Sequence, residues 1–247
     1  MFQQNLAEVY DLVYTGRGKN YKHEAGEVAE QIRRRRPDAR TLLDVACGTG
    51  EHLVHLREMF DEAEGLEYTG QMLGVARQKL GEDMPLHSGN MCDFDLGRRF
   101  DAAISMFASI AYLRTVEQLG QAVERIAGHV EPGGVLVVEP WYFPDRFLEG
   151  YVSTSVVREG DLTISRVSRT TRDERTRCNV NMEIHIVLAG PDGMRHFTET
   201  QVLSLFTLDQ YLDAFTAAGC VPEFLEPDET FPCGLFVAVR ERAEATG

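Results

Sequence analysis

Apolar and polar positions follow two different periods along the chain, and the change falls near residue 140. Upstream of that point, short apolar runs alternate with segments whose apolar residues recur at helical spacing. The strand-like runs are 41–46, 63–67, 85–88, 100–105 and 134–139, and the helix-like segments are 5–14, 20–35, 51–60, 70–80 and 115–130. This alternation predicts an α/β fold with a Rossmann-like, doubly wound and mostly parallel sheet that carries helices on both faces.

Downstream of Pro140 the apolar residues recur at every second position, as in Leu162-Thr163-Ile164-Ser165-Arg166-Val167 and Met182-Glu183-Ile184-His185-Ile186-Val187. Period two indicates half-buried antiparallel strands. Turn residues stand at Gly160, 172–175 and 191–193. A helix at 207–218 and strands at 222–225 and 235–240 are then expected to return the chain to the first sheet as an antiparallel pair.

These patterns predict the domain organisation. We expect residues 1–149 and 205–247 to form a core around a seven-stranded sheet, with the first two helices as a lid. Residues 150–204 would form an antiparallel sheet inserted over the carboxyl ends of the parallel strands, which is where ligands of such folds bind.

Composition limits the partners. The chain has 247 residues, of which 25 are Lys or Arg and 39 are Asp or Glu, so its formal net charge is −14. Such a charge disfavours nucleic acid and anionic membranes as targets, because both attract net positive surfaces. The run Arg33-Arg34-Arg35-Arg36 precedes Pro37 and is expected at a helix end, where cations complement the helix dipole.

Cysteine usage and the N-terminus indicate a cytoplasmic protein. The five cysteines show no paired short spacing of the kind that zinc sites or secreted disulfide frameworks use. We therefore expect reduced thiols and no metal site. The sequence begins Met-Phe-Gln-Gln-Asn without a basic segment leading into an apolar stretch, and no apolar run approaches bilayer length.

The run Asp44-Val45-Ala46-Cys47-Gly48-Thr49-Gly50 carries the first chemical signal. It ends an apolar strand in a glycine turn, which lets the backbone bend sharply and approach a ligand without a Cβ in the way. Glu67 closes the next strand, 23 positions after Asp44 (67 − 44), where a carboxylate can accept ribose hydroxyls. Together these features predict a site for an adenosine-containing cofactor.

A dinucleotide site would need a third glycine to cradle a pyrophosphate, and this turn lacks it. The run instead resembles the Asp/Glu-x-x-x-Gly-x-Gly signature of class I S-adenosylmethionine-dependent methyltransferases. Gly89-Asn90-Met91-Cys92-Asp93 resembles their adenine loop, and Ser105-Met106-Phe107 resembles the end of their fourth strand. The resemblance implies the cofactor residues Tyr21, Asp44, Ala46, Cys47, Gly48, Gly50, Glu67, Tyr68, Met72, Asn90, Met91, Cys92, Met106 and Phe107.

Motifs over nearly the whole chain narrow the resemblance. They include Gly16-Arg17-Gly18-Lys19-Asn20-Tyr21, Val138-Glu139-Pro140-Trp141-Tyr142-Phe143-Pro144 and Ala214-Phe215-Thr216-Ala217-Ala218-Gly219. They are similar to bacterial N,N-dimethyltransferases that act on TDP-linked amino-deoxysugars in antibiotic biosynthesis. The resemblance implies a nucleotide-linked amino sugar as substrate, S-adenosylmethionine as cofactor, and S-adenosylhomocysteine as product. It also suggests a homodimer.

The family carries Ser-Gly-Arg-Gly-Leu-Phe near its C-terminus, whereas this chain has Phe231-Pro232-Cys233-Gly234-Leu235-Phe236. Because the arginine is gone, an altered phosphate site that uses Arg17, Lys19 or Arg166 becomes an alternative. Trp141 and Tyr142 are expected to wall the substrate pocket, and His185 is a further candidate for substrate binding.

The acceptor amine must be neutral to attack a methyl group, so a polar aromatic or imidazole side chain is expected near it. Candidates are Tyr14, Tyr21, Tyr112, His185 and His196. The resemblance favours Tyr112 for orienting the acceptor and Tyr14 for contacting it. Tyr21 would contact the methionine carboxylate of the cofactor.

Two other functions remain open at this stage. One is N-, O- or C-methylation of a different natural product, such as a nucleoside, peptide or polyketide. The other is cofactor binding without turnover.

Overall fold

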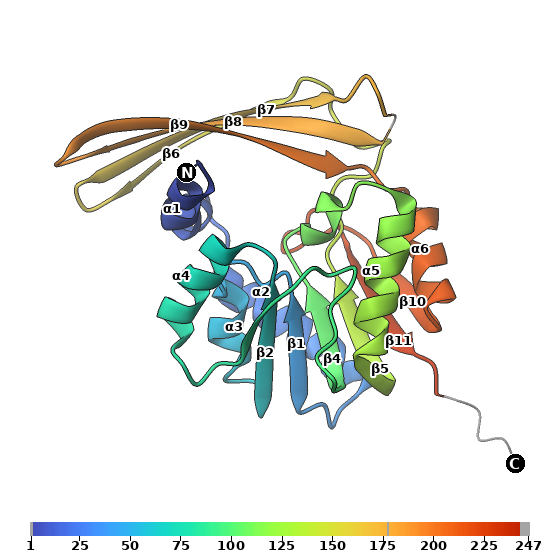
Figure 1. Ribbon diagram of the computed structural model, residues 1–247. Coiled ribbons are helices and arrows are strands. Elements are labelled where there is room, and N and C mark those ends of the chain that lie inside the picture. The colour runs from blue at the N-terminus through green and yellow to red at the C-terminus, as the bar shows by residue number, and fades with distance from the viewer. Residues whose placement is uncertain (1, 177, 243–247) are drawn as a thin grey trace, which may run out of the picture.

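The structure is a computed structural model that describes residues 2–176 and 178–242. Figure 1 shows two layers: a seven-stranded sheet with helices on both faces, and above it a second sheet of four long strands. The first helix, α1 (Phe2–Gly16), lies beneath the second sheet and beside α4 (Gly70–Leu80). The α/β fold class predicted from the sequence is confirmed.

The central sheet has the strand order β10-β11-β5-β4-β1-β2-β3. Its strands are β1 (Thr41–Val45), β2 (Glu62–Glu67), β3 (Leu86–Ser88), β4 (Phe100–Ser105), β5 (Val130–Val138), β10 (Cys220–Leu225) and β11 (Leu235–Arg240). Only β11 runs antiparallel to its neighbours, which are β5 and β10. The chain order reverses between β1 and β4, so a crevice is expected at the carboxyl ends of these two strands.

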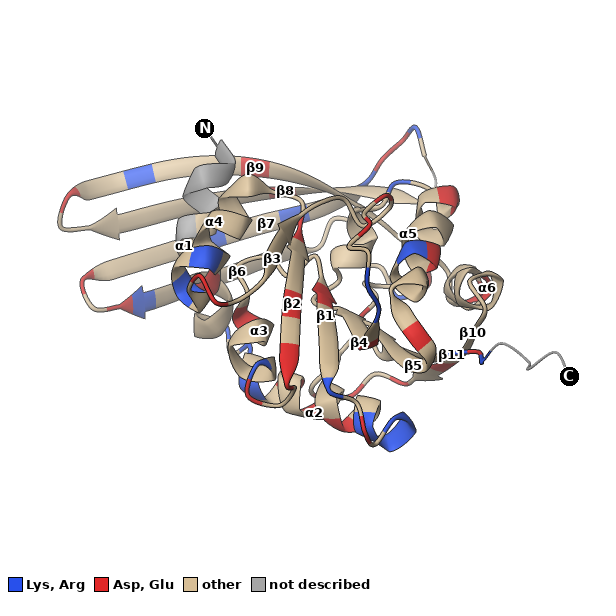
Figure 2. Cartoon of the chain, turned by 60° about the horizontal axis from the view of Figure 1, so that its bottom comes forward, with Lys and Arg blue, Asp and Glu red and all other residues tan. Residues whose placement is uncertain are grey.

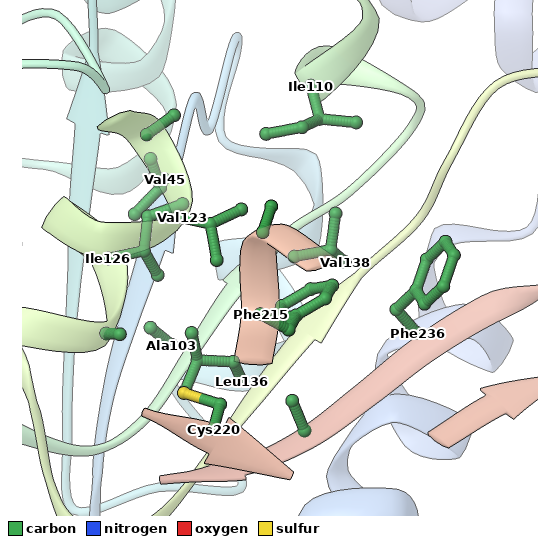
Figure 3. Close-up of a cluster of buried hydrophobic side chains, with 14 of the residues drawn as sticks. Val45, Ala103, Ile110, Val123, Ile126, Leu136, Val138, Phe215, Cys220 and Phe236 are labelled. Atoms are coloured by element: carbon green, nitrogen blue, oxygen red, sulfur yellow. The ribbon is translucent and has the colours of Figure 1, made fainter. Parts of the chain in front are cut away.

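Helices cover both faces of this sheet, as the strand–helix alternation predicts. On one face, α5 (Val116–Gly128) and α6 (Leu208–Ala217) pack their apolar sides against β1, β4 and β5. Figure 3 shows part of this core, with Val123 and Ile126 of α5 and Phe215 of α6 directed at the strands. On the other face lie α2 (Tyr21–Arg35), α3 (Glu51–Leu56) and α4.

The second sheet is an antiparallel meander inserted between β5 and α6. Its strands are β6 (Val152–Glu159), β7 (Leu162–Arg172), β8 (Asn179–Gly190) and β9 (Gly193–Ser204). One end of its inner face packs on α1, where Val9 and Val13 meet Ile164, Ile186 and neighbouring residues. The other end packs on the short 3₁₀ helix η1 (Ser109–Tyr112), which follows β4. The sheet therefore covers the carboxyl ends of the parallel strands.

Three local expectations differ from the structure. Of the two N-terminal helices, only α1 lies under the second sheet, because α2 buries Ala25, Val28 and Ile32 against the central sheet as a core helix. Helix α3 ends at Leu56 rather than near residue 60, and the chain continues in tight turns. Strand β5 begins at Val130, four residues early, and passes through two glycines.

The surface charges follow the expected distribution. Figure 2 shows acidic and basic residues intermingled over helices and turns, with a basic cluster at the end of α2. Within that cluster, Arg34 pairs with Glu30, Arg35 with Glu223 and Arg36 with Asp101. All five cysteines are unpaired. In the described part of the chain, no helix is long and apolar enough to cross a membrane.

Candidate active site

The glycine turn after β1 forms the floor of the site. Ala46, Gly48 and Gly50 have φ values of 62°, 59° and 79°, which are left-handed conformations. At Gly50 the φ of 79° favours glycine, and an added Cβ would also meet Leu80 Cδ1 at 2.7 Å and force that side chain to shift. At Gly48 nothing lies within 4 Å of such a Cβ, which means that this backbone faces open space. Gly48 therefore leaves room for a ligand to approach the main chain.

Glu67, at the end of β2, is fixed by the glycine turn and by its own loop. Its Oε2 accepts the backbone N–H of Gly48 at 3.0 Å. Its Oε1 accepts both the backbone N–H and the hydroxyl of Thr69, each at 2.8 Å. Each carboxylate oxygen has two lone pairs. The carboxylate is therefore pre-oriented, and Oε2 keeps acceptor capacity for one ligand hydroxyl.

Asp44 lies beneath this pair with 1% of its surface exposed. Burial, and then the charge of Glu67, raise its pKa to about 8. Its Oδ2 has no hydrogen-bond partner among the described residues. A buried oxygen left without a partner is costly, and a ligand that donates a hydrogen bond would remove that cost.

A pocket opens above these residues, at the crevice between β1 and β4. Its lining consists of Tyr10, Tyr21, Asp44, Ala46, Cys47, Gly48, Thr49, Glu51, His52, Met106, Phe107 and Ser109. The Tyr21 hydroxyl is buried and, within the described chain, also has no partner. The structure thus brings together seven of the predicted cofactor residues, and two of the seven, Asp44 and Tyr21, carry a buried polar atom that could bind a ligand.

Beside Tyr21 lies a buried charged chain. Lys19 Nζ contacts Glu24 at 2.7 Å, and Glu24 Oε2 contacts His52 Nε2 at 2.9 Å. Burial keeps the pKa of His52 below its usual range. Burial alone would raise the pKa of Glu24, but the contacts with His52 and Lys19 lower the pKa of Glu24 below its usual value. The His52 ring packs edge-on against Tyr21, with 5.1 Å between ring centroids. This network holds the first turn of α2 against the pocket.

The wall of the pocket is a strained turn after β4. Phe107 and Ala108 both have φ of 55°, which costs about 1–3 kcal/mol for each non-glycine residue. The buried carboxylate of Glu139, at the end of β5, accepts the Phe107 N–H at 2.6 Å. The Phe107 ring meets the Tyr14 ring edge-on at 4.7 Å, and Lys19 Nζ lies 3.9 Å from its centroid. Glu139 therefore secures the turn that carries this contact.

The predicted adenine side is more open. Tyr68 is 71% exposed, and Met72 and Met91 are partly buried. The Asn90 Oδ1 accepts the N–H of Cys92 at 3.0 Å, so this oxygen is used within its own turn. The amide NH₂ of Asn90 and the second lone pair of its Oδ1 remain for a base. Asn90 can therefore both donate to and accept from an adenine base.

The inner face of the second sheet carries the candidate residues for the acceptor side. Arg166 of β7 is 5% exposed and donates to Ser168 Oγ at 2.8 Å and to Met182 Sδ at 3.6 Å. Burial lowers its pKa, and the described residues place no carboxylate within ion-pair distance of it. Tyr112 of η1 is 47% exposed, and desolvation on its protein-facing side, with the charges of Tyr14 and Glu199, raises its pKa. Tyr112 therefore stays protonated at neutral pH.

Three of the remaining candidates border the same region. Arg17 donates to Ser153 Oγ on β6 at 3.3 Å, and its guanidinium lies 5.8 Å from the Tyr14 ring centroid. Trp141 packs with the apolar cluster that joins η1 to the second sheet. Tyr142 contacts Trp141 and is 44% exposed. All three can therefore border an acceptor placed between η1 and the sheet.

His185 is not brought to the site. Its neighbours Ile184 and Ile186 point inward, so the alternation of β8 turns His185 to the outer face. There it contacts Glu183 at 2.9 Å and stacks on His196. The prediction that His185 binds substrate is therefore not supported, and His196 lies outside the site for the same reason.

A larger hollow of about 600 Å³ lies elsewhere, at the opposite end of the parallel strands. It is lined by Asp95, Gly97, Arg98, Arg99, Glu124, Arg125, Gly128, His129, Ala217, Ala218 and Arg240. In parallel α/β sheets, ligands bind at the carboxyl ends of the strands. The smaller pocket at the glycine turn lies at that end and is therefore the candidate site.

Comparisons with known proteins agree with this geometry. Residues 42–134 match the family model described as a methyltransferase domain. The chain is 48% identical over 240 residues to the dTDP-3-amino-3,4,6-trideoxy-alpha-D-glucopyranose N,N-dimethyltransferase of Streptomyces venezuelae, covering 97% of this chain and 99% of that one. The chain belongs to this family of N,N-dimethyltransferases. The methyltransferase is also 41% identical over 240 residues to the dTDP-4-amino-2,3,4,6-tetradeoxy-D-glucose N,N-dimethyltransferase of Saccharopolyspora spinosa, covering 97% and 94% of the two chains.

A solved structure supports the cofactor. The methyltransferase superposes with a TM-score of 0.86 on CalS10, an amino pentose methyltransferase from Micromonospora echinaspora with S-adenosylmethionine bound, at 45% identity and with 94% and 96% of the chains covered. S-adenosylmethionine is the cofactor of this family, and the pocket fits it. Asp44 and Tyr21 offer buried oxygens that have no partner among residues 2–176 and 178–242, Gly48 faces open space, and Glu67 retains acceptor capacity.

Some residues around the site were missed by sequence reasoning. Glu139 belongs to the Val138–Pro144 motif, but the motif did not indicate its bond to Phe107. Glu199 lacks a motif, and the Glu24–His52 pair is 28 residues apart in sequence. Asp11, which accepts a hydrogen bond from Thr49, is one of several polar residues of α1 and gave no signal of its own. These contacts depend on tertiary packing.

Proposed function

We propose that this methyltransferase transfers two methyl groups from S-adenosylmethionine to the amine of a TDP-linked amino-deoxysugar in antibiotic biosynthesis. The observation that carries the proposal is the reach of the similarity: it covers 97% of this chain and so includes the second sheet, which forms the acceptor side. Relatives that share only the cofactor fold would support no such substrate.

The roles of the residues follow from their positions. Residues 1–149 and 205–247 would hold the cofactor, with Asp44, Tyr21 and Glu67 as its polar partners. Residues 150–204 would hold the acceptor. Arg166 is the candidate for the diphosphate, because a buried guanidinium without a carboxylate is suited to an anionic ligand. Arg17 lies nearer the edge of the sheet and would assist it.

Bound S-adenosylmethionine supplies a sulfonium methyl group that an amine lone pair can attack in line. The chain contributes mainly position, which can be worth about 7–11 kcal/mol in well-oriented reactions. The phenols of Tyr112 and Tyr14 can hydrogen-bond the amine and aim its lone pair, and Phe107 separates the acceptor side from the cofactor floor. The second sheet covers the carboxyl ends of the strands and so lies over the reacting groups (Figure 1).

The test is to incubate the purified protein with S-adenosylmethionine and TDP-linked 3-amino and 4-amino deoxysugars, and to follow the mass of the acceptor. We expect a gain of two methyl groups on one of the amines. The matched control is a TDP-sugar with hydroxyl in place of the amine, which should gain none. A single methyl on the hydroxyl sugar, or cofactor binding with no product on either amine, would contradict the proposal.

Two further features belong to the proposal. A homodimer, suggested by the family, is tested by light scattering of the purified protein. A cytoplasmic location is supported by the five unpaired cysteines, and fractionation of cells expressing the protein tests it.

A further inference from the structure

Glu199 is a charged residue that has no role in the proposed binding of cofactor and acceptor. It lies in the middle of β9 on the inner face of the second sheet, between Phe197 and Gln201. Gln201 Nε2 donates to its Oε1 at 2.8 Å. Its Oε2 is buried and has no hydrogen-bond partner in the described chain. A buried carboxylate oxygen without a donor is costly unless a ligand supplies one.

The register of the sheet relates Glu199 to Arg166. Glu199 pairs with Ile184 on β8, and Ile184 pairs with Ser168 on β7, two positions from Arg166. The two charged residues are thus two strands apart, which is about 10 Å across the sheet. Neither forms an ion pair among the described residues. The inner face therefore presents one positive and one negative group that do not neutralise each other.

Tyr112 lies near both charges. The carboxyl end of β9 packs on η1, where Leu203 and Ala111 belong to one apolar cluster. The Glu199 carboxylate raises the pKa of Tyr112, after larger effects from burial and Tyr14, and Arg166 lowers it. Both charges therefore act on the phenol that is our candidate for orienting the acceptor.

A ligand of matching charge would satisfy this face. The acceptor of the proposed function carries an anionic diphosphate at one end and a basic amine at the other. We propose that Glu199 binds the amine of the acceptor, while Arg166 binds the diphosphate, so that the second sheet recognises a substrate with both charges. This inference rests on the proposed function and adds the residue that would select an amine over a hydroxyl.

The number of hydrogen bonds that the amine can donate to Glu199 falls with each methyl transfer. The amine binds to Glu199 as an ammonium ion, which supplies the positive charge, and attacks after releasing its extra proton to water. The neutral primary amine has two N–H donors, its monomethyl product one, and its dimethyl product none. A carboxylate accepts hydrogen bonds and cannot donate them when ionised. Glu199 would therefore hold the acceptor for a first and a second transfer and lose its hydrogen bond to the neutral dimethyl product. Its role is that of a binding and positioning residue.

The experiment compares Glu199→Gln with Glu183→Gln. Glu183 lies on β8 and pairs with Thr200, but it faces outward and contacts His185, so the same substitution there leaves the inner face unchanged. For E199Q we expect the KM for the amino sugar to rise about tenfold or more, as for the loss of one charged hydrogen bond. The KM for S-adenosylmethionine should stay unchanged. E183Q should behave like the wild type.

A second readout is the preference for amine over hydroxyl. Wild type should bind the TDP-amino sugar more tightly than its hydroxyl analogue in equilibrium titration, and E199Q should lose most of that preference. Circular dichroism confirms that each variant is folded. If folded E199Q keeps both its KM for the acceptor and its preference, the inference is overturned while the function stands. If wild type neither binds nor methylates any amino sugar, both fail.

Discussion

Glu139 offers a direct test of how the pocket is built. Its carboxyl is 7% exposed at the end of β5, and its Oε2 accepts the N–H of the left-handed residue Phe107. Burial raises its pKa from 4.5 to about 7, while Lys19 acts in the opposite direction. Glu139→Gln keeps an acceptor oxygen for Phe107 but removes the titration. The change therefore separates the charge of Glu139 from its hydrogen bond.

The magnitude follows from the two pKa values. The folded protein binds a proton at Glu139 over a range in which the unfolded chain has already lost it. The resulting stability is fully present below pH 4.5 and is lost as the pH rises through about 7. Each pH unit between the two pKa values is worth ~1.4 kcal/mol, so ionised Glu139 costs the folded state about 3 kcal/mol. The E139Q variant, which has no carboxyl at this position, would carry no such dependence.

The assay is urea unfolding of wild type and E139Q, without cofactor, between pH 5.5 and 8.5. Lower pH is avoided because the isoelectric point is about 4.9, where the protein loses charge repulsion. Over this window the free energy of unfolding of wild type should fall by about 2 kcal/mol relative to E139Q. A constant offset between the two proteins would not affect this difference in slope.

The control is Glu124→Gln on the exposed side of α5, which removes one solvated carboxylate from the same protein. Its curve should run parallel to that of wild type. If the curves of wild type and E139Q also run parallel, Glu139 does not titrate in this range. The inference that burial raises the pKa of Glu139 behind the Phe107 turn would then be wrong.

Two further predictions concern the cofactor floor and α1. Gly48→Ala should weaken S-adenosylmethionine binding at least tenfold, as measured by calorimetry. The control Gly160→Ala has a similar φ of 56° in the β6–β7 turn with open space around it, so it should cost only about 1–2 kcal/mol in stability and leave the affinity unchanged; equal affinities of the two variants would contradict the role of Gly48. Asp11→Asn should weaken the contacts with Thr49 and Lys79 and speed hydrogen exchange in α1; unchanged exchange would contradict this.

The glycine turn and its acid were predictable because both belong to local sequence signals. Gly48 follows β1 and Glu67 ends β2, and neighbouring parallel strands end at the same edge of the sheet. The second sheet was predictable from its period of two. The same period also indicates which face of the sheet each residue occupies. Arg166 shares the parity of Ile164 and lies on the inner face. His185 lies between two buried isoleucines, so the sequence alone could have assigned it to the outer face.

Other contacts could not be read from the sequence. Glu139 and Phe107 are 32 residues apart and meet only because β4 and β5 are neighbours in parallel register. Glu199 becomes part of the site only when β9 packs on η1. Likewise α2 has an amphipathic pattern that fits a lid or a core helix equally well. Tertiary packing decides these questions, because pattern and propensity define a face but not its partner.

Helix α1 joins the two halves of the site. Val9 and Val13, four residues apart, share one face and pack on the second sheet. Tyr10 and Tyr14 form the adjacent face, and their rings lie 6.3 and 4.7 Å from the Phe107 ring. Asp11 projects elsewhere, to the hydroxyl of Thr49.

Through these contacts, α1 sets the distance between the methyl donor and the acceptor. Asp11 accepts from Thr49 at 2.5 Å in the glycine turn and from Lys79 of α4 at 2.7 Å. One rigid helix thus connects the acceptor sheet, the Phe107 wall and the cofactor turn. A shift of the second sheet along α1 would therefore move the acceptor relative to the cofactor floor. Since methyl transfer depends mainly on this alignment, α1 is the element through which a distant change in the sheet would alter the rate.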